Sequence, residues 1–337
     1  MPVLPALFQT AGGTYKADTC EPLKAAVTRG EARLVAVARR SYPGKPLPAR
    51  RLVEICTAGF WDAPKDQRWG LDWHRNEGIE LTYLDRGKLG FAVDGQTCAL
   101  RRGDLTVTRP WQLHRVGLPE VTASRLYWLI LDVGVRRPHQ PWRWPKWLVC
   151  SPQDLARLTR LLRHNEQPVW QAGGGVGECF RRLGACLELA DASARETRLR
   201  LHINEVLIAL LELLQRKRIT LDESLSSSQR TVELFLAELP KHIEHEWDLE
   251  TMAEQCGLGR SRFAWHCRQL TNLTPLAFLT RCRVEAAVAL LRGEANLNIT
   301  EIALRCGFQS SQYFATVFRR QMRQTPRACV REARKAK

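Results

Sequence analysis

The stretch Ile302-Ala303-Leu304-Arg305-Cys306-Gly307-Phe308 decides the fold of this chain, because an earlier stretch repeats its pattern. The earlier copy is Met252-Ala253-Glu254-Gln255-Cys256-Gly257-Leu258, at an offset of 50 residues. Further matches at an offset of 51 are Phe263 with Phe314, Arg268 with Arg319, and Thr274-Pro275 with Thr325-Pro326. One inserted residue in the second turn accounts for the change. Two such units in tandem predict two helix-turn-helix motifs that lay helices into successive major grooves of DNA.

The composition favours a polyanionic partner. The 337 residues include 51 Lys and Arg against 35 Asp and Glu, which gives a net charge of +16. Residues 251–337 hold 15 basic and 5 acidic residues, so this part alone carries +10. That density favours nucleic acid through the release of counterions. The alternative is a generally basic protein, since the first 250 residues also carry +6.

Targeting and redox signals indicate a cytoplasmic, nucleoid-associated protein. No run of 18 or more apolar residues occurs, so we expect no membrane span. The start, Met1-Pro2-Val3-Leu4-Pro5, lacks the basic and apolar regions of a secretion signal. The 11 cysteines form no C-x-x-C pair, which indicates a reducing compartment where most of them serve as small core residues.

Residues from about 50 to 133 show the pattern of short strands. The expected strands are 80–84, 88–93, 96–100, 104–108 and 125–131. Asp94-Gly95 lies between the second and third of these and favours a two-residue hairpin turn, because both positions can take positive φ. Closely spaced strands with Gly-rich turns predict a small β-barrel or jelly roll.

Residues from about 152 to 217 switch to helical periodicity. We expect helices at 154–163, 177–192 and 195–217, with Gly173-Gly174-Gly175 as a loop. The last helix has a wide apolar stripe, made by Leu199, Ile203, Val206, Leu207, Leu210, Leu211 and Leu214. This stripe either packs on its own barrel or forms a homodimer interface. The polar, serine-rich stretch 219–229 then predicts an interdomain linker.

Helix caps mark the two repeated motifs. The expected helices are 231–246, 249–256, 260–270, 274–292, 301–306 and 310–322. Asp248 is the expected N-cap of the second, and Gly257 supplies the left-handed residue that ends it. Asn298 or Thr300 caps the corresponding helix of the second motif. Pro275 opens the long helix that spaces the two modules.

The outward faces of the two recognition helices supply candidate base contacts. These residues are Ser261, Ala264, Trp265, Ser311, Gln312, Ala315 and Thr316. Gln312 is the best direct reader, because a Gln amide can pair bidentately with adenine, and Ala264 suits a thymine methyl. Trp265 either stacks on a sugar or base edge or packs against the helix after the linker. Phe263, Cys267, Phe314 and Phe318 are expected to point inward.

Arginines on the same helices suit DNA phosphates better than base edges. They are Arg260, Arg262, Arg268, Arg319, Arg320 and Arg323. The alternative for any single one is a solvated surface side chain. As a group they favour a contact with the DNA backbone.

The C-terminal part resembles the DNA-binding domain of AraC-type transcription regulators. The motif Ile302-Ala303-x-x-x-Gly307-Phe308-x-Ser310-x-x-Tyr313-Phe314-x-x-x-Phe318-Arg319, followed by Thr325-Pro326, carries the resemblance over about residues 230–334. It implies a seven-helix unit with two helix-turn-helix motifs joined by a long helix. The first module departs from the pattern. Gly259 stands where Ser is common, Trp265 where Arg is common and Cys267 where Phe is common, which leaves its base contacts open.

The strand-rich part is similar to a cupin barrel. His74-x-Asn76-x-x-x-Glu80 precedes Gly87, and Gly103-Asp104 precedes Pro110 and His114. Asn76 stands where metal cupins have their second histidine, but His74, Glu80 and His114 could still form a two-histidine, one-carboxylate set suited to iron(II). The alternative is that Glu80 is simply a strand residue and that both histidines line or brace a pocket. Regulators of this kind mostly bind ligands without metal, so the resemblance implies no metal and no other cofactor.

Tryptophans give a second pointer to a ligand pocket. They are Trp61, Trp69, Trp73, Trp111 and Trp128 in or beside the barrel, followed by Trp142, Trp144 and Trp147. An aromatic wall with a few polar groups suits a sugar or a flat small molecule. The alternative is that most of them build the core. We expect Trp73 and Trp111 to join His74, Glu80 and His114 in the effector pocket.

Together these patterns predict a two-domain α+β protein. The expected parts are a cupin-like β-barrel (double-stranded β-helix) at 1–150, a helical segment at 151–218, a linker at 219–229 and an all-α DNA-binding domain at 230–337. The expected function is transcription regulation, in which an effector changes how a dimer presents its DNA-binding domains. Double-stranded DNA, the effector and a second copy are expected partners, with RNA polymerase as a further candidate.

Two other classes of function compete with this interpretation. An architectural DNA binder with an inactive sensor would show little sequence preference. A metal-dependent cupin enzyme would need a complete metal set, and this one lacks a histidine. A methyl-acceptor repair protein would need a Pro-Cys-His run, which does not occur. We therefore expect no enzyme activity.

Overall fold

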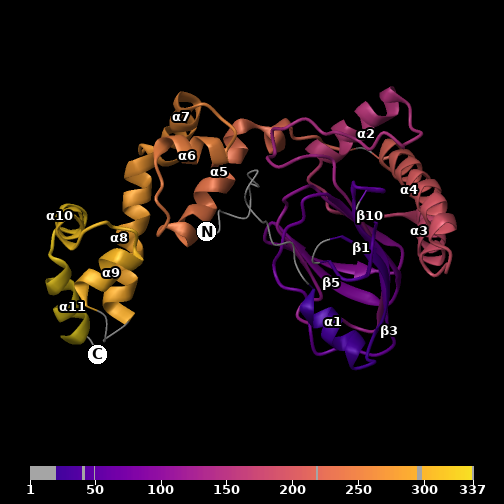
Figure 1. The fold of residues 1–337 in the computed structure, drawn as a ribbon, viewed down its shortest axis with the longest axis horizontal. Helices are drawn as coiled ribbons and strands as arrows, with labels where there is room; N and C mark the ends of the chain where they lie inside the picture. Colours follow the sequence, from indigo (N-terminus) through magenta and orange to yellow (C-terminus); the bar gives the residue numbers. More distant parts are fainter. Residues whose placement is uncertain (1–19, 40–41, 49, 218, 294–297, 336–337) are drawn as a thin grey trace. The chain divides into compact units, whose positions relative to one another are not determined.

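The computed structural model describes residues 20–39, 42–48, 50–217, 219–293 and 298–335. The chain divides into two compact units, and the boundary between them falls between Ser226 and Ser227. Strands and the helices α1 to α4 build the N-terminal unit, whereas the C-terminal unit is helical (Figure 1). Within the described residues, no helix combines the length and the apolar character needed to cross a membrane.

The described part of the N-terminal unit contains two sheets. The larger has the strand order β10-β7-β4-β9-β3-β1-β2, and the smaller has the order β6-β5-β8. The strands are β1 (Arg33–Ala38), β2 (Lys45–Pro46), β3 (Ile55–Ala63), β4 (Ile79–Arg86), β5 (Lys88–Val93), β6 (Gln96–Arg101), β7 (Asp104–Thr108), β8 (His114–Val116), β9 (Ser124–Leu131) and β10 (Val169–Gln171). All pairs are antiparallel except β1 with β2.

The strand predictions are confirmed, with additions at both ends. Each of the five expected strands lies within β4, β5, β6, β7 or β9. Asp94 and Gly95 have φ of 45° and 84°, as a hairpin with two positive-φ positions requires. The sheet also recruits β1 and β2 before the predicted barrel region and β10 after it. Of these, β2 and β10 are short edge strands, which a search for alternating runs does not detect, whereas β1 lies between β3 and β2. The expected strands also omit β3 and β8 within the barrel region.

Among the described residues, four helices and a short 3-10 helix complete this unit. They are α1 (Glu21–Thr28), α2 (Pro152–His164), α3 (Gly173–Leu187), α4 (Ala192–Gln215) and η1 (Glu223–Ser226). The prediction of a loop at Gly173-Gly174-Gly175 is wrong, because these residues form the first turn of α3. Their low helix propensity is outweighed by the packing of the following turns on the sheet. At Gly177 and Gly184, a Cβ would collide with Tyr83 and Tyr127, so the missing side chains allow this close packing.

The apolar stripe of α4 is buried within its own unit. All seven predicted stripe residues are buried, and α4 packs along α3. This packing accounts for the stripe without a second copy. Leu201 and Ile208, on another face of the same helix, remain exposed.

The C-terminal unit consists of seven α-helices and one 3-10 helix within the described residues. They are α5 (Ser228–Glu238), η2 (Leu239–His242), α6 (Leu249–Gln255), α7 (Arg260–Thr271), α8 (Pro275–Gly293), α9 (Ile299–Arg305), α10 (Ser311–Met322) and α11 (Pro326–Lys335). The predicted single helix 231–246 is wrong in its second half. Pro240 lacks an N–H for an α-helical bond, and the chain tightens into η2 there.

Candidate nucleic-acid interface and effector pocket

Capping side chains build both helix-turn-helix motifs in the same way. Asp248 forms a capping box with Thr251 at the start of α6, and Asn298 forms one with Glu301 at the start of α9. These residues satisfy backbone N–H groups that the helix leaves unpaired. Gly257 ends the first motif's short helix with a φ of 60°, and Gly307 ends the second with a φ of 77°. The predicted caps and turn glycines are therefore confirmed.

The first recognition helix, α7, exposes the predicted outward face. Ser261 is exposed, Ala264 is half-buried, and Trp265 is 56% exposed. Phe263 and Cys267 are buried, as predicted. The Trp265 ring contacts His266 edge-on, at 4.8 Å between ring centroids, and stays open to solvent. Of the two alternatives for Trp265, the structure therefore favours an exposed side chain that is free to meet a ligand.

The second recognition helix, α10, has a more polar outward face. Gln312 and Thr316 are exposed, and Ser311 and Ala315 are half-buried. The Thr316 hydroxyl donates to the Gln312 carbonyl oxygen at 3.0 Å, which leaves its lone pairs as acceptors. The Gln312 side chain has no hydrogen bond to another described residue, so its amide can offer a donor and an acceptor to one base.

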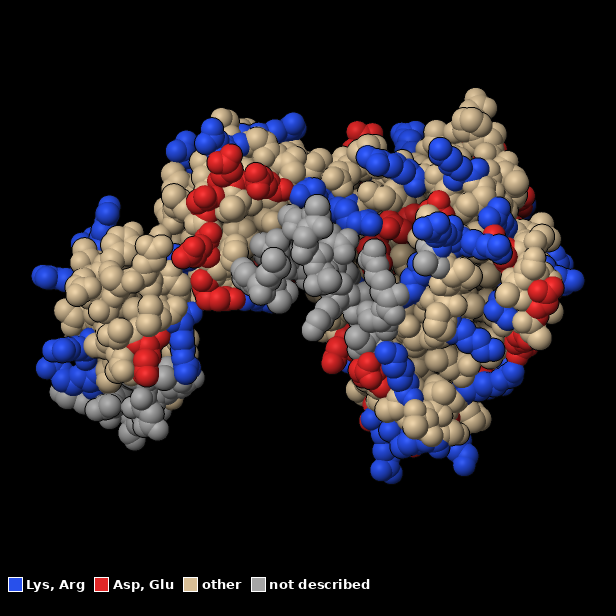
Figure 2. Space-filling view, in the orientation of Figure 1, with Lys and Arg blue, Asp and Glu red and all other residues tan. Residues whose placement is uncertain are grey.

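The predicted phosphate contacts are all available. The six arginines on or at the end of the two recognition helices are exposed, and none forms an ion pair with another described residue. Figure 2 shows basic side chains around the edge of this unit and a run of acidic ones across its visible face. Unpaired guanidinium groups can exchange their counterions for phosphates without breaking ion pairs of their own.

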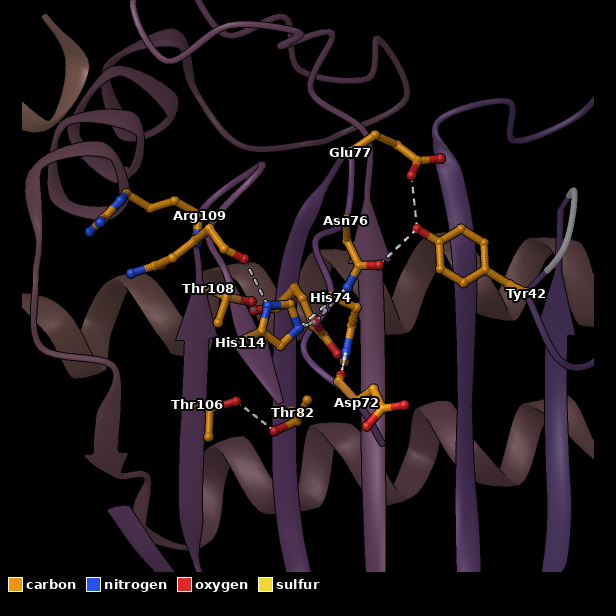
Figure 3. A network of polar contacts seen from close by, with 12 residues as sticks. Tyr42, Asp72, His74, Asn76, Glu77, Thr82, Thr106, Thr108, Arg109 and His114 are labelled. Atoms are coloured by element: carbon orange, nitrogen blue, oxygen red, sulfur yellow. Dashed lines mark hydrogen bonds and ion pairs between the residues drawn. The ribbon is translucent and has the colours of Figure 1, made fainter. Parts of the chain in front are cut away.

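In the N-terminal unit, a buried polar network joins the cupin-like motifs (Figure 3). Glu80 lies on β4, and its Oε2 is 2.6 Å from Nε2 of His114 on β8. Asn76 donates from Nδ2 to the same Glu80 oxygen at 2.7 Å. The Tyr42 hydroxyl lies 3.0 Å from Asn76 Oδ1 and 2.8 Å from Glu77 Oε2. The network thus ties the loop before β2 to the loop before β4.

Backbone carbonyls fix the proton positions of both histidines. His74 Nδ1 lies 2.7 Å from the Asp72 carbonyl oxygen, and His114 Nδ1 lies 2.9 Å from that of Gln112. Because a carbonyl oxygen only accepts, each Nδ1 must carry the hydrogen. Burial alone would raise the pKa of Glu80, but the charges and hydrogen bonds of His114, His74 and Asn76 lower it overall. Glu80 is therefore a buried carboxylate that needs a positive or hydrogen-bonding partner.

These three side chains converge closely enough to hold a metal ion. One ligand atom from each of His74, Glu80 and His114 lies within 4.8 Å of the others. Histidines that bind metals typically donate their second ring N–H to a carbonyl or carboxylate, as both do here. Two imidazoles and one carboxylate suit iron(II) or a similar ion. The residues present therefore fit such an ion.

A narrow cavity lies beside this network. Its lining comprises Cys20, Leu23, Tyr42, Pro43, Thr57, Trp61, Leu71, His74, Asn76, Glu80, Thr82, Val116, Leu126, Trp128 and Ile130. The centres of water molecules can occupy about 40 Å³ of it, which is room for about three waters. The buried indole N–H of Trp61 has no hydrogen-bond partner among the described residues. A ligand with an acceptor oxygen could satisfy this group.

The prediction of the pocket residues is wrong in part. His74 and Glu80 line the cavity, whereas His114, Trp73 and Trp111 do not. Trp73 is 43% exposed, whereas Trp111 is buried and donates its indole N–H to the Val135 carbonyl at 2.7 Å. Proximity in sequence to the histidines does not fix the direction of these side chains. Trp61 and Trp128, on the paired strands β3 and β9, form the aromatic wall instead.

Comparison with known proteins gives a match in each of the two units. Residues 252–332 match a family described as a helix-turn-helix domain, and residues 62–130 match one described as a cupin domain. The HTH-type transcriptional activator RhaS of Escherichia coli O1:K1 / APEC is 33% identical over 183 residues, which cover 52% of this chain and 63% of that protein. RhaS of Escherichia coli strain SE11 is 38% identical over the same length and coverage. The chain therefore contains a helix-turn-helix domain and a cupin domain, the combination expected of AraC-type regulators.

The matches cover different shares of the chain. This chain spans less than two thirds of the length of the curated relatives it matches. Among solved structures, the DNA-binding domain of AdpA, in complex with a target DNA, is 31% identical with a TM-score of 0.30, covering 32% of this chain and 95% of that one. ToxT from Vibrio cholerae O395 is 10% identical with a TM-score of 0.32, covering 90% of this chain and 96% of that one.

Two histidine contacts lie outside what the AraC-family pattern predicts. His266 on α7 is buried, and its Nε2 lies 3.1 Å from the Ser228 hydroxyl at the start of α5. His164 at the end of α2 lies 3.0 Å from the Ser226 hydroxyl. A polar residue on the inner face of an expected helix is the available signal at His266, since buried polar groups need partners.

Proposed function

We propose that this chain is a sequence-specific transcription regulator, whose unit Ser227–Lys337 binds DNA and whose unit Lys16–Ser226 binds a small-molecule effector. The observation that carries the proposal is the pair of recognition helices, α7 and α10, joined by α8 and each carrying exposed arginines without ionic partners among the described residues. Two such helices in one unit suit two successive major grooves. The relatives named as transcriptional activators support the same function.

In this proposal the outward faces of α7 and α10 contact different segments of the major groove. Gln312 contacts a base edge in the major groove, with Ser311, Ala315 and Thr316 around it. Ser261, Ala264 and Trp265 face the other groove segment. The six arginines named above hold the phosphates on either side and fix the position of the unit on the duplex.

The cavity of the N-terminal unit is the proposed effector pocket. An effector larger than about three waters must displace lining side chains, among them Leu23 of α1. Binding would therefore change the structure of the unit that surrounds it. Such a change regulates DNA binding only if the effector prefers one arrangement of the protein over another.

A second copy and a cytoplasmic location complete the proposal. Leu201 and Ile208 are exposed on α4 at a spacing of seven residues, two helical turns apart. An exposed apolar pair on one face supports a dimer contact there. Sedimentation of a variant with Leu201→Glu and Ile208→Glu should then give a monomer where the natural chain gives a dimer.

RNA polymerase is the further partner, and no catalytic role is assigned to the barrel.

The proposal is tested by selecting binding sites for the full-length protein from a random duplex library. An enriched motif with two boxes about one helical turn apart is expected, since each module contacts one groove segment. Arg319→Ala should weaken binding to every sequence and reduce the slope of log K against log salt by about 0.9. A library without an enriched sequence would favour the architectural alternative.

A metal-dependent sensor is the second candidate function, because His74, Glu80 and His114 already converge. Anaerobic titration of the purified chain with iron(II), with cobalt(II) as a spectroscopic probe, should then give one bound ion per chain. The ion should be lost in Glu80→Gln and retained in Asp72→Asn, where the carbonyl that holds His74 is unchanged. If neither metal binds, the network serves an organic effector alone.

A further inference from the structure

The N-terminal unit carries a basic surface that the proposed function does not use. Residues 16–226 hold 34 basic and 24 acidic residues, a net charge of +10. Residues 136–163 alone hold seven basic residues and one acidic residue, so this short segment supplies +6 of that charge. It also contains Trp142, Trp144 and Trp147 between the basic residues. We call residues 136–163 the basic segment.

The basic segment forms one continuous surface, because its loop is fastened to α2. Trp144 donates its indole N–H to the Thr159 hydroxyl on α2 at 2.7 Å. Arg163, one turn further along α2, donates to the His139 carbonyl at 2.9 Å. Trp142 packs edge-on against Trp144, at 5.9 Å between ring centroids. The loop residues and the α2 residues therefore share one part of the surface, where basic side chains gather in Figure 2.

Four cations of this segment are exposed and unpaired. Arg143, Lys146, Arg157 and Arg160 are exposed, and none has a carboxylate within ion-pair distance among the described residues. By contrast, Arg136 is held by Asp132 at 2.7 Å. Unpaired cations on one surface repel each other and attract a polyanion.

Burial shifts the pKa of the two titratable groups at the end of α2, and neighbouring charges add to the shift at His164. Burial lowers the pKa of Arg163, and no carboxylate offsets that effect. The pKa of His164 is lowered by burial and then by Arg163, with Arg160 adding to the effect, against opposing contributions of Glu223 and Asp222. The two acidic residues of the following segment thus do not neutralise the end of α2.

The connection from α2 to the DNA-binding unit is short. The end of α2 is tied to η1, since His164 contacts Ser226 and Asn165 pairs with Leu221. Ser227 is already the N-cap of α5, and its side chain accepts from the Arg230 N–H at 3.0 Å. Ser226 and Ser228 can be no more than about 7 Å apart, because each residue spans at most about 3.6 Å. The helix α2 is therefore joined to the DNA-binding unit by a short stretch of chain.

We propose that Arg143, Lys146, Arg157 and Arg160 bind the phosphate backbone of duplex DNA that flanks the segment held by the two helix-turn-helix motifs. The inference rests on the proposed function for the position of the DNA. The flanking duplex is the polyanion that the C-terminal unit itself brings to this surface. Each phosphate neutralised by one of these cations releases counterions, so the interaction adds affinity without base specificity.

The test compares two duplexes and two variants of the full chain. One duplex is limited to the selected site, and the other extends it by about two helical turns on each side, or roughly 20 base pairs. The test variant carries Arg143→Gln, Lys146→Gln, Arg157→Gln and Arg160→Gln. The control variant removes the same charge elsewhere in the unit, through Lys65→Gln, Lys88→Gln, Arg101→Gln and Arg102→Gln, all exposed positions.

The expected result is weaker binding that is confined to the test variant on the long duplex. Its salt slope should fall by up to about 0.9 for each phosphate that the variant no longer neutralises, or about 2–4 in all, and its affinity should drop by about 10- to 100-fold at moderate salt. The short duplex should respond alike to both variants. Equal slopes for the test and control variants on the long duplex would overturn the proposal. If the natural chain selects no sequence, the proposed function fails, and the same comparison on random duplex still decides whether this surface binds DNA.

Discussion

The two helix-turn-helix modules of the C-terminal unit share a backbone geometry and differ in their side chains. Both start with a capping box, at Asp248 and Asn298, and both turn at a positive-φ glycine. Both recognition helices end in a left-handed residue with a φ of 58°, at Asn272 and Arg323. The backbone geometry is thus repeated even where the side chains are not. Differences between the modules therefore report on function and packing rather than on fold.

The inner faces of the two recognition helices pack against different kinds of residues. In the second module, Phe314 contacts Phe308 and Phe318, at 5.0 and 5.4 Å between ring centroids. In the first module, Cys267 occupies the position equivalent to Phe318. The aromatic partner of Phe263 is instead Phe235 of α5, at 5.7 Å between ring centroids. The first module depends on α5 for its core, whereas the second supplies its own aromatic cluster.

The outer faces differ in chemistry. At equivalent positions the first module has Ser261 and Trp265, and the second has Gln312 and Thr316. The second face offers directed hydrogen bonds, which distinguish base pairs in the major groove. The first offers a short hydroxyl and a large exposed indole. We infer that the second module supplies most of the sequence discrimination and the first supplies contact area.

The largest effect should come from the core difference. Phe318→Ala should lower the free energy of unfolding of the C-terminal unit by about 3–5 kcal/mol, the usual cost of emptying a buried phenylalanine site. Cys267→Ala, at the equivalent position, removes a single atom and should cost about 1 kcal/mol. Hydrogen exchange of the α7 and α10 amides in the full chain measures both. Equal decreases in stability would mean that the two cores are built alike.

A smaller effect should separate the two base-contacting faces. Gln312→Ala should cost about 1–3 kcal/mol at one base position and relax the preference there. Ser261→Ala should cost less than about 1 kcal/mol, because one hydroxyl makes at most one such bond. Competition binding against a panel of single-base variants of the selected site gives both values. A uniform weakening for every sequence would remove Gln312 from the base contacts.

The exposed indole gives the next test. Trp265→Thr, which installs the residue of the second module, should reduce affinity for the selected site by about tenfold, or about 1.4 kcal/mol. Its effect on stability should stay within about 0.5 kcal/mol, because the side chain is exposed. Binding and thermal unfolding are measured on the same protein. Reduced stability with unchanged affinity would show that Trp265 is a packing residue.

Local signals allow much of this fold to be predicted from the sequence. Caps such as Asp248, turn residues such as Gly257 and Asp94-Gly95, and the 3.6-residue period of α4 depend on neighbouring residues alone, and each is found where expected. The helical start at Gly173 escapes prediction, because it depends on how later turns pack on the sheet. The end of the α-helix before Pro240 is also not predicted. Its cause is local, but the apolar periodicity of the sequence continues past the proline and hides the break.

The candidate pocket is only partly predictable for a related reason. The spacing of His74, Glu80 and His114 identifies them, and the structure brings them together. The directions of Trp61 and Trp128 depend on strand register, which pairs Trp61 with Leu126 and Gly59 with Trp128 across β3 and β9. Register is a long-range property, and a shift of one residue moves a side chain to the opposite face. Sequence proximity therefore points to Trp73 and Trp111 in place of Trp61 and Trp128.

The smallest effect concerns a histidine that only the first module contains. The pKa of His266 is lowered by burial and by the charge of Arg262, whereas the second module has Val317 at the equivalent position. In the unfolded chain a histidine titrates near pH ~6.5, so below that value the unfolded state binds more protons than the folded state. Stability is then complete above the unfolded pKa and declines as the pH falls toward the lower folded value.

His266→Val should remove this decline and so make the first module respond to pH as the second does. Urea unfolding of the C-terminal unit within the full chain, measured on both sides of the unfolded pKa, gives the difference in stability for each protein. His242→Gln is the matched control, because it removes a histidine from the same unit without touching α7. If the natural chain and His266→Val are destabilised equally on acidification, protonation of His266 is not the cause. The pH response then belongs to groups that the two modules share, and the contact between His266 and Ser228 serves only to position α7 against α5.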